Sequence, residues 1–177
     1  MAISLLVFCR LDYHQQLAAN FTNCLEMLMP NETADEYVRR EWRELGFFYD
    51  RDDTTKEWKL IGSRSGLLRF RDELLAYAED SANDYKAEHS HYGPYLYLKI
   101  MTWPEPGFDE DSIHGSLADL KRLAVIVGNK LTVAHTGDSV CIQNEFSANS
   151  SYALVLEVRP DDFDPASADP MRPKEGG

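Results

Sequence analysis

Strand-length apolar runs occur in pairs in this chain, and a short polar turn joins the two runs of each pair. The first pair, GFFYD (46–50) and EWKLIGS (57–63), flanks the polar sequence RDDTTK, and the second pair, residues 139–143 and 152–158, flanks SANSS. Two such runs around a turn-rich segment predict a β-hairpin. Strands that follow one another in hairpins favour an α+β fold over a fold in which single strands alternate with helices.

Two longer segments, residues 63–80 and 116–131, carry apolar residues at helical spacing and each predict a helix. Their boundaries come from cap-forming residues, which are Ser65 at the start of the first helix, Ser116 with Asp119 at the start of the second, and Gly128-Asn129 at its end. The positions predicted to be buried are Leu67, Phe70, Leu74, Tyr77 and Ala78 in the first helix, with Leu68 and Leu75 widening the stripe, and Leu117, Leu120, Leu123, Ala124 and Val127 in the second.

Residues 95–103, YLYLKIMTW, form a run with large side chains on both faces of a strand. A strand that is apolar on both faces is typical of the interior of a sheet. We therefore expect a central strand with Leu96, Leu98 and Ile100 on its buried face. The segment before it, residues 80–94, is polar and contains two histidines, so we expect a loop there.

The order of these segments defines the expected architecture. Residues 3–9, ISLLVFC, predict a first strand, and apolar residues spaced between positions 17 and 28 predict a short helix that ends at Pro30. No internal repeat or linker divides the chain. We expect a single α+β domain over residues 1–160, built on an antiparallel or mixed sheet with two to three helices packed mainly on one face. Residues 161–177 are polar, and we expect them to form a flexible C-terminal tail.

The charge of the chain restricts its partners. The 177 residues carry a formal net charge of −12. Binding of nucleic acid requires basic groups that neutralise phosphate, so we expect no nucleic-acid partner. Anionic membrane surfaces also repel an acidic protein, and no stretch approaches the roughly 20 apolar residues of a membrane span, so we expect no membrane association. The partner that this charge favours is a basic protein.

The three cysteines, Cys9, Cys24 and Cys141, form no C-x-x-C pair. Cys9 and Cys141 lie in apolar, strand-like runs, where a free thiol behaves as a small hydrophobic side chain. An odd number of isolated cysteines favours a reducing compartment over a disulfide framework. The N-terminal sequence has no basic segment before its short apolar run, so it does not predict a signal peptide. We therefore expect a cytoplasmic protein.

Sequence motifs for nucleotide binding and hydrolysis are absent, because the chain has no G-x-G-x-x-G, Walker A, H-E-x-x-H or G-x-S-x-G sequence. We therefore expect no enzyme, no cofactor and no metal. The alternative is a small metal-dependent enzyme, because His89 and His91 could place two imidazoles on the same side of an extended segment. Such a site needs a third ligand, for which Glu88, His114 and His135 are candidates.

Acidic loops with interspersed aromatic side chains precede and follow the strand predicted at residues 95–103. Aromatic anchors within a charged rim are typical of protein-binding hot spots. A strand of about nine residues spans roughly 30 Å, so we expect two surface patches at its opposite ends. The residues predicted to bind a partner are Asp84, Glu88, His89, His91, Tyr92, Glu105, Phe108, Asp109, Glu110 and Asp111.

Three segments of the chain, taken in order, resemble a protein family. Their sequences are GSRSGLLRFRDELLAYA (62–78), HSHYGPYLYLKIM (89–101) and YALVLEVRPDDFDP (152–165). Over residues 58–160 the chain resembles the small acidic α+β immunity proteins of bacterial polymorphic-toxin systems. The resemblance implies a cytoplasmic antitoxin that binds and occludes a cognate toxin domain, a basic one such as a nuclease, without catalysis.

Two further expectations concern assembly. An acidic adaptor subunit that binds another basic protein is a second non-catalytic alternative to an antitoxin, because the same surface charge serves both. The apolar run at residues 152–158 would also allow a homodimer to form by sheet extension, provided that this strand lies at the edge of its sheet.

Overall fold

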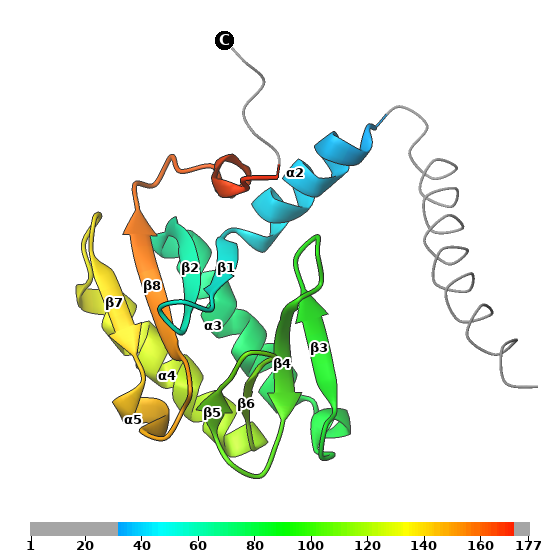
Figure 1. Ribbon diagram of the computed structural model, residues 1–177, viewed down its shortest axis with the longest axis vertical. Coiled ribbons are helices and arrows are strands. Elements are labelled where there is room, and N and C mark those ends of the chain that lie inside the picture. The colour runs from blue at the N-terminus through cyan, green and yellow to red at the C-terminus, as the bar shows by residue number, and fades with distance from the viewer. Residues whose placement is uncertain (1–31, 172–177) are drawn as a thin grey trace, which may run out of the picture. The chain divides into compact units, whose positions relative to one another are not determined.

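Four helices and two four-stranded sheets make up residues 32–171, the part of the chain that the computed structural model describes (Figure 1). Both sheets are mixed, and the α+β class is confirmed. The elements in chain order are α2 (Ala34–Leu45), β1 (Phe48–Asp52), β2 (Glu57–Ser63), α3 (Arg64–Glu79), the 3-10 helix η1 (Ser81–Asn83), β3 (His89–Tyr92), β4 (Leu98–Thr102), β5 (Gly107–Phe108), β6 (Ile113–Gly115), α4 (Leu117–Val133), β7 (Ser139–Ile142), α5 (Asn144–Ser147), β8 (Ala153–Arg159) and the 3-10 helix η2 (Pro165–Ala168).

The strand predicted at residues 3–9 and the helix predicted between residues 17 and 28 lie outside the described residues, as do Cys9 and Cys24. Val38 begins the structural unit to which the rest of the described chain belongs. The fold of that unit positions all the residues predicted to bind a partner.

The first sheet has the strand order β1-β2-β8-β7. The pairs β1–β2 and β7–β8 are antiparallel, which confirms both predicted hairpins, whereas β2 and β8 are parallel. Because β8 is bonded on both sides, the expectation that residues 152–158 form a free edge for a homodimer is wrong. Cys141 lies on the edge strand β7 and is exposed, so it is not the buried side chain that its apolar neighbours suggest.

The second sheet has the strand order β3-β4-β6-β5. Its interior strand β4 buries Leu98 and Ile100 completely, as predicted for the central strand. The strand is shorter than expected, because Leu96 has a left-handed φ of 57° and is 58 % exposed. The expectation of a single sheet is wrong because the polar segments around positions 80–94 and 105–115 contain three short strands, β3, β5 and β6.

The two long helices pack against each other on one face of the sheets (Figure 1), with α3 against β2 and β8 and α4 against β6 and β7. The predicted stripe of α3 is buried except for Leu68 and Leu75, which are half-buried, and that of α4 is buried except for the half-exposed Leu117. The N-cap of α3 is Ser63 and not Ser65, because the Ser63 hydroxyl accepts the Gly66 N–H at 3.1 Å. The capping box of Ser116 and Asp119 is present as predicted.

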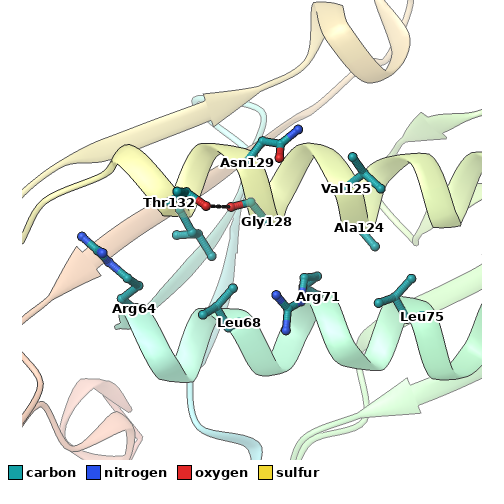
Figure 2. Close-up of a pocket in the computed structure, with 10 residues that line it drawn as sticks. Arg64, Leu68, Arg71, Leu75, Ala124, Val125, Gly128, Asn129 and Thr132 are labelled. Atoms are coloured by element: carbon teal, nitrogen blue, oxygen red, sulfur yellow. Dashed lines mark hydrogen bonds between the residues drawn. The ribbon is translucent and has the colours of Figure 1, made fainter.

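Gly128 does not end α4, which continues to Val133. A Cβ at Gly128 would lie 3.3 Å from Cδ of Arg71, so this glycine allows the side chain of Arg71 on α3 to lie close to the backbone of α4 (Figure 2). The two helices leave a groove of about 540 Å³ between them, whose apolar lining includes Leu68, Leu75 and Val125. The glycine therefore serves helix packing rather than helix termination.

Residues 161–171 do not form the flexible tail that their polar composition suggests. Asp169 is only 3 % exposed, and its Oδ2 accepts the Trp42 Nε1–H at 2.9 Å and the Tyr95 hydroxyl at 2.7 Å. Burial of a polar indole N–H requires an acceptor, and this carboxylate supplies it. The expectation of flexibility is therefore wrong for this stretch, and residues 172–177 lie outside the described part of the chain.

The Asp169→Ala variant should lower the free energy of unfolding by about 3 kcal/mol, because it removes the charged acceptor of the buried Trp42 indole N–H and of the half-buried Tyr95 hydroxyl. Urea denaturation at pH 7 measures the change. Asp161→Ala, at an exposed position of the same stretch, is the matched control and should change stability by less than about 0.5 kcal/mol. Equal losses in the two variants would show that residues 161–171 are not fixed by Asp169.

Candidate functional site

Antiparallel pairing of β3 with β4 brings the two flanks of the central strand together. The two strands lie side by side (Figure 1), with His89 paired to Met101 and Tyr92 to Leu98 in the register. The Ala87 N–H donates to the Thr102 carbonyl, and the Thr102 N–H donates to the Glu88 carbonyl, both at 2.9 Å. The segment before β3 therefore lies beside the C-terminal end of β4. The expectation that the two flanks lie at opposite ends is wrong for this segment.

This hairpin produces an acidic and aromatic surface. The ammonium group of Lys86 lies 4.4 Å from the ring centroid of Trp103, which joins the loop before β3 to the end of β4. Tyr85 is 71 % exposed, and the side chains of Asp84, Glu88 and Glu105 make no hydrogen bond or ion pair with any residue that the structure describes. We name this the Tyr85 surface, which consists of Asp84, Tyr85, Lys86, Glu88, His89, Trp103 and Glu105.

A buried polar network holds the Tyr85 surface in place. The Tyr77 hydroxyl, on α3, donates to the Glu88 carbonyl at 2.7 Å and lies 3.0 Å from Oγ1 of Thr102. The Thr102 hydroxyl donates to the Asn83 carbonyl at 2.6 Å, and the Asn83 amide donates to the Tyr77 carbonyl at 2.8 Å. Burial raises the pKa of Tyr77, which keeps the hydroxyl protonated as a donor. The network also offsets the left-handed φ of 70° at Ala87, which costs about 1 kcal/mol in a residue with a Cβ.

The Tyr77→Phe variant should lower the free energy of unfolding by about 1 kcal/mol, because it removes the hydrogen bonds that the buried hydroxyl makes with Glu88 and Thr102. Hydrogen exchange should become faster at the amides of Ala87 and Thr102, which close the loop onto β4. Tyr85→Phe removes an exposed hydroxyl and should leave both measurements unchanged. Unaltered exchange in Tyr77→Phe would contradict the role of this network.

His89 and His91 lie on the same side of β3, as expected for an H-x-H pair, and their ring centroids are 5.0 Å apart. Both rings are exposed, and Nδ1 of His89 lies 2.9 Å from the Ala87 carbonyl. Among residues 32–171, no group of three histidine, cysteine or carboxylate side chains could hold a metal ion. The structure therefore does not bring the candidate third ligands Glu88, His114 and His135 to this pair.

Two aromatic residues in the predicted set are not surface anchors. Phe108 is 1 % exposed and packs on Phe146 at a centroid distance of 5.0 Å, so its place among partner-binding residues is wrong. It is buried because β5 carries it under α5. Tyr92 is half-buried, and burial raises its pKa to about 12. Trp103 is half-buried beneath Lys86.

The acids at 109–111 form the β5–β6 turn, which precedes Ile113. Ile113 pairs with Ile100 in the middle of β4, so this turn lies towards the start of β4, away from the loop before β3. One oxygen of Asp109 accepts the backbone N–H groups of Asp111 at 2.8 Å and Ser112 at 2.7 Å, so this carboxylate shapes its own turn. The structure thus separates Glu110 and Asp111 from Asp84, Glu88 and His89, whereas Asp109 lines a pocket together with Glu105.

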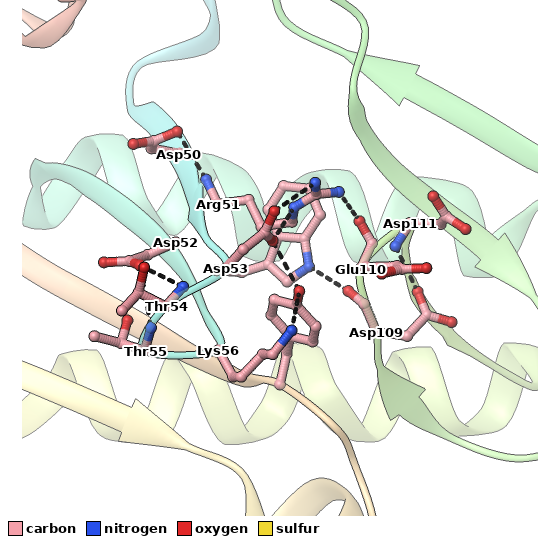
Figure 3. A network of polar contacts seen from close by, with 12 residues as sticks. Asp50, Arg51, Asp52, Asp53, Thr54, Thr55, Lys56, Asp109, Glu110 and Asp111 are labelled. Carbon is pink, nitrogen blue, oxygen red and sulfur yellow. Dashed lines mark hydrogen bonds and ion pairs between the residues drawn. The ribbon is translucent and has the colours of Figure 1, made fainter.

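The β5–β6 turn meets the β1–β2 turn in a second cluster of charges (Figure 3). The Trp58 indole N–H donates to the Asp109 carbonyl at 2.7 Å, and Arg51 donates to the Glu110 carbonyl. We name this the turn cluster, whose charged members are Asp50, Arg51, Asp52, Asp53, Lys56, Asp109, Glu110 and Asp111.

Two aspartates of the first hairpin form hydrogen bonds and ion pairs with other groups of the protein. Asp53 accepts the Tyr152 hydroxyl at 2.8 Å and pairs with Arg51 at 2.7 Å, and these interactions lower its pKa. Backbone N–H groups, that of Thr55 first, and Lys59 lower the pKa of Asp52 to about 2. The turn cluster is therefore less negative towards a partner than its aspartates suggest, although Glu110 and Asp111 are exposed.

Stability should depend on pH through Asp52. Its pKa is about 2 in the folded chain and 3.8 without these contacts, so its contribution is complete above pH 3.8 and is lost as the pH falls towards 2. The difference in free energy of unfolding between the wild-type protein and Asp52→Asn should follow that course in denaturation series at stepped pH. A difference that is constant from pH 2 to pH 6 would contradict the lowered pKa.

The sequence search did not identify the residues that build this site, Tyr77, Thr102 and Asn83, or the role of Lys86. Tyr77 was visible only as one position of a buried helical stripe. Among residues 32–171 no helix is long and apolar enough to cross a membrane. Comparisons of the chain with protein-family models, with curated proteins and with solved structures found no match.

Proposed function

We propose that this protein is a non-catalytic binding protein of the immunity type, which binds a basic toxin domain in the cytoplasm and occludes it. The observation that carries the proposal is the Tyr85 surface, where the exposed Tyr85 and the half-buried Trp103 lie beside carboxylates that pair with no described residue. The order of segments that resembles immunity proteins supports the same reading. Occlusion requires no catalytic group, only a surface that covers the active region of the partner.

The Tyr85 surface has the physical properties of a binding hot spot. Tyrosine and tryptophan offer large contact areas with few rotatable bonds, and truncation of such anchors commonly costs 2 kcal/mol or more. Asp84, Glu88 and Glu105 are available to basic side chains because no described residue pairs with them. The net charge of −12 would accelerate the encounter with a positively charged partner, and salt would slow that encounter.

An adaptor subunit that binds another basic protein remains the second candidate function, because the same surface would serve it. The two functions differ in the activity of the partner. An antitoxin protects cells from the product of a neighbouring gene, whereas an adaptor has a partner whose expression alone is harmless. Co-expression with each neighbouring gene separates them by growth, and co-purification shows the complex.

Tyr85→Ala should weaken the complex with that gene product about 30-fold, which corresponds to the 2 kcal/mol of a typical hot-spot residue. Titration calorimetry of the purified pair measures the change. Val133→Ala is the matched control, because Val133 is also 71 % exposed but lies on α4. Tyr85→Phe should retain most of the affinity, since the ring supplies the contact.

Two results would overturn the proposal. If no neighbouring gene product is both toxic and bound by this protein, the immunity function fails. If Tyr85→Ala and Val133→Ala weaken a complex equally, binding does not use the Tyr85 surface.

A further inference from the structure

A concave pocket of about 550 Å³ opens beside the β5–β6 pair, between the end of β4 and the segment that follows α5. Glu105 of the Tyr85 surface lies at this pocket, together with Asp109, His114 and Ser150. Among the described residues that line it there is no lysine or arginine. The pocket is therefore continuous with the proposed binding surface and carries only acidic and neutral groups.

His114 is held in one orientation in the pocket. Its Nδ1 lies 3.1 Å from Oγ of Ser112 and 3.4 Å from Oδ2 of Asp109. The completely buried Ser112 donates its hydroxyl proton to Oδ1 of Asp109 at 3.2 Å, so its oxygen is left to accept from the ring. Both neighbours of Nδ1 are thus acceptors, and the neutral ring carries its proton on Nδ1. Nε2 is left with a free lone pair.

Gly107 leaves open the space in front of this lone pair. A Cβ at position 107 would lie 2.6 Å from Nε2 of His114 and 3.5 Å from Oγ of Ser150. Nε2 makes no hydrogen bond to any described residue, and the Ser150 hydroxyl oxygen accepts the Phe108 N–H at 2.9 Å. The absence of a side chain at Gly107 therefore keeps an imidazole acceptor open towards the pocket.

The chemistry of the pocket selects a ligand rich in N–H donors. The acceptors in its lining that no described residue satisfies are the Nε2 lone pair of His114 and the carboxylate of Glu105, and they lie beside the neutral side chains of Asn149 and Ser150. Burial lowers the pKa of His114, against the opposing effect of the Asp109 and Glu105 carboxylates and with a contribution from Lys99 on β4, so the ring remains an acceptor at neutral pH. An anionic ligand would be repelled, whereas a guanidinium or ammonium group could donate both to the carboxylate of Glu105 and to Nε2 of His114.

We propose that this pocket receives the side chain of an arginine or lysine from the partner protein. The aliphatic stem would lie along Pro106, and the cationic head would lie between Glu105 and His114. This inference rests on the proposed function, because it assigns to the bound partner a basic residue that inserts beside the Tyr85 surface. It adds a specific recognition contact to the general attraction between opposite charges.

The first test uses Nα-acetylarginine amide as the probe and Nα-acetylcitrulline amide as its neutral counterpart of nearly equal shape. Nuclear magnetic resonance of the imidazole of His114 should show a saturable shift with the arginine compound and none with the citrulline compound. Glu105→Gln should weaken this binding about 2- to 5-fold, as expected for an exposed ion pair. Glu88→Gln, on the Tyr85 surface but outside the pocket, should leave it unchanged.

Gly107→Ala fills the space in front of Nε2 without removing an acceptor, and it should abolish the shift caused by the arginine compound. If this variant does not fold, Glu105→Gln still decides the question. Equal shifts from both compounds, or no shift from either, would overturn the proposed recognition of a cationic group. Unchanged binding in Glu105→Gln would overturn the assigned position of that group.

The second test separates this inference from the proposed function. In the complex with the toxic neighbouring gene product, Glu105→Gln and Gly107→Ala should each weaken binding, and Glu79→Gln, on α3, should not. If the complex forms but is insensitive to both pocket variants, the pocket inference fails and the immunity function stands. If the arginine compound binds but no toxic partner exists, the pocket chemistry stands and the immunity function fails.

Discussion

The hydroxyl of Tyr77 joins the long helix α3 to the hairpin that forms the candidate binding surface. It lies within hydrogen-bonding distance of both Glu88 and Thr102, and these two residues also bond to each other. Without this hydroxyl, the loop before β3 would be held to the sheet mainly by its main-chain hydrogen bonds to Thr102. The exposed position of Tyr85 therefore depends on a buried contact from another element of the fold.

Net charge alone is a poor guide to where an acidic protein binds. Asp52, Asp53 and Asp109 lie in turns rich in acids, but each accepts hydrogen bonds within the protein, Asp52 and Asp109 from backbone N–H groups of their own turns and Asp53 from the Tyr152 hydroxyl. Such carboxylates have already exchanged water for internal donors and gain less from an external cation. Asp84, Glu88 and Glu105 retain their hydration and their charge for a partner, which is why the candidate site lies at that end of the second sheet.

Much of the fold is predictable from periodicity, and the site is less so. Both hairpins and the buried faces of α3 and α4 follow from strong repeating patterns over many residues. The strands β5 and β6 contain two and three residues, too few to show alternation, and they lie in a segment rich in glycine, proline and acids. The acidic neighbours of Phe108 in the sequence predicted an exposed side chain, but the pairing of β5 with β6 directs this side chain into the core. Such pairings over long sequence distances leave no local signal.

In the proposed complex, the stiffness of the surface matters as much as its charge. The Tyr85 loop is closed by main-chain bonds to Thr102, and the His114 ring is fixed by Asp109 and Ser112. Groups that are already ordered lose little conformational freedom on binding, so more of their contact energy contributes to affinity. A mobile acidic segment could attract the same basic partner, but it could not exclude a neutral side chain from a preformed pocket. Discrimination between partners therefore depends on the fixed geometry around Gly107, and attraction depends on the free carboxylates beside it.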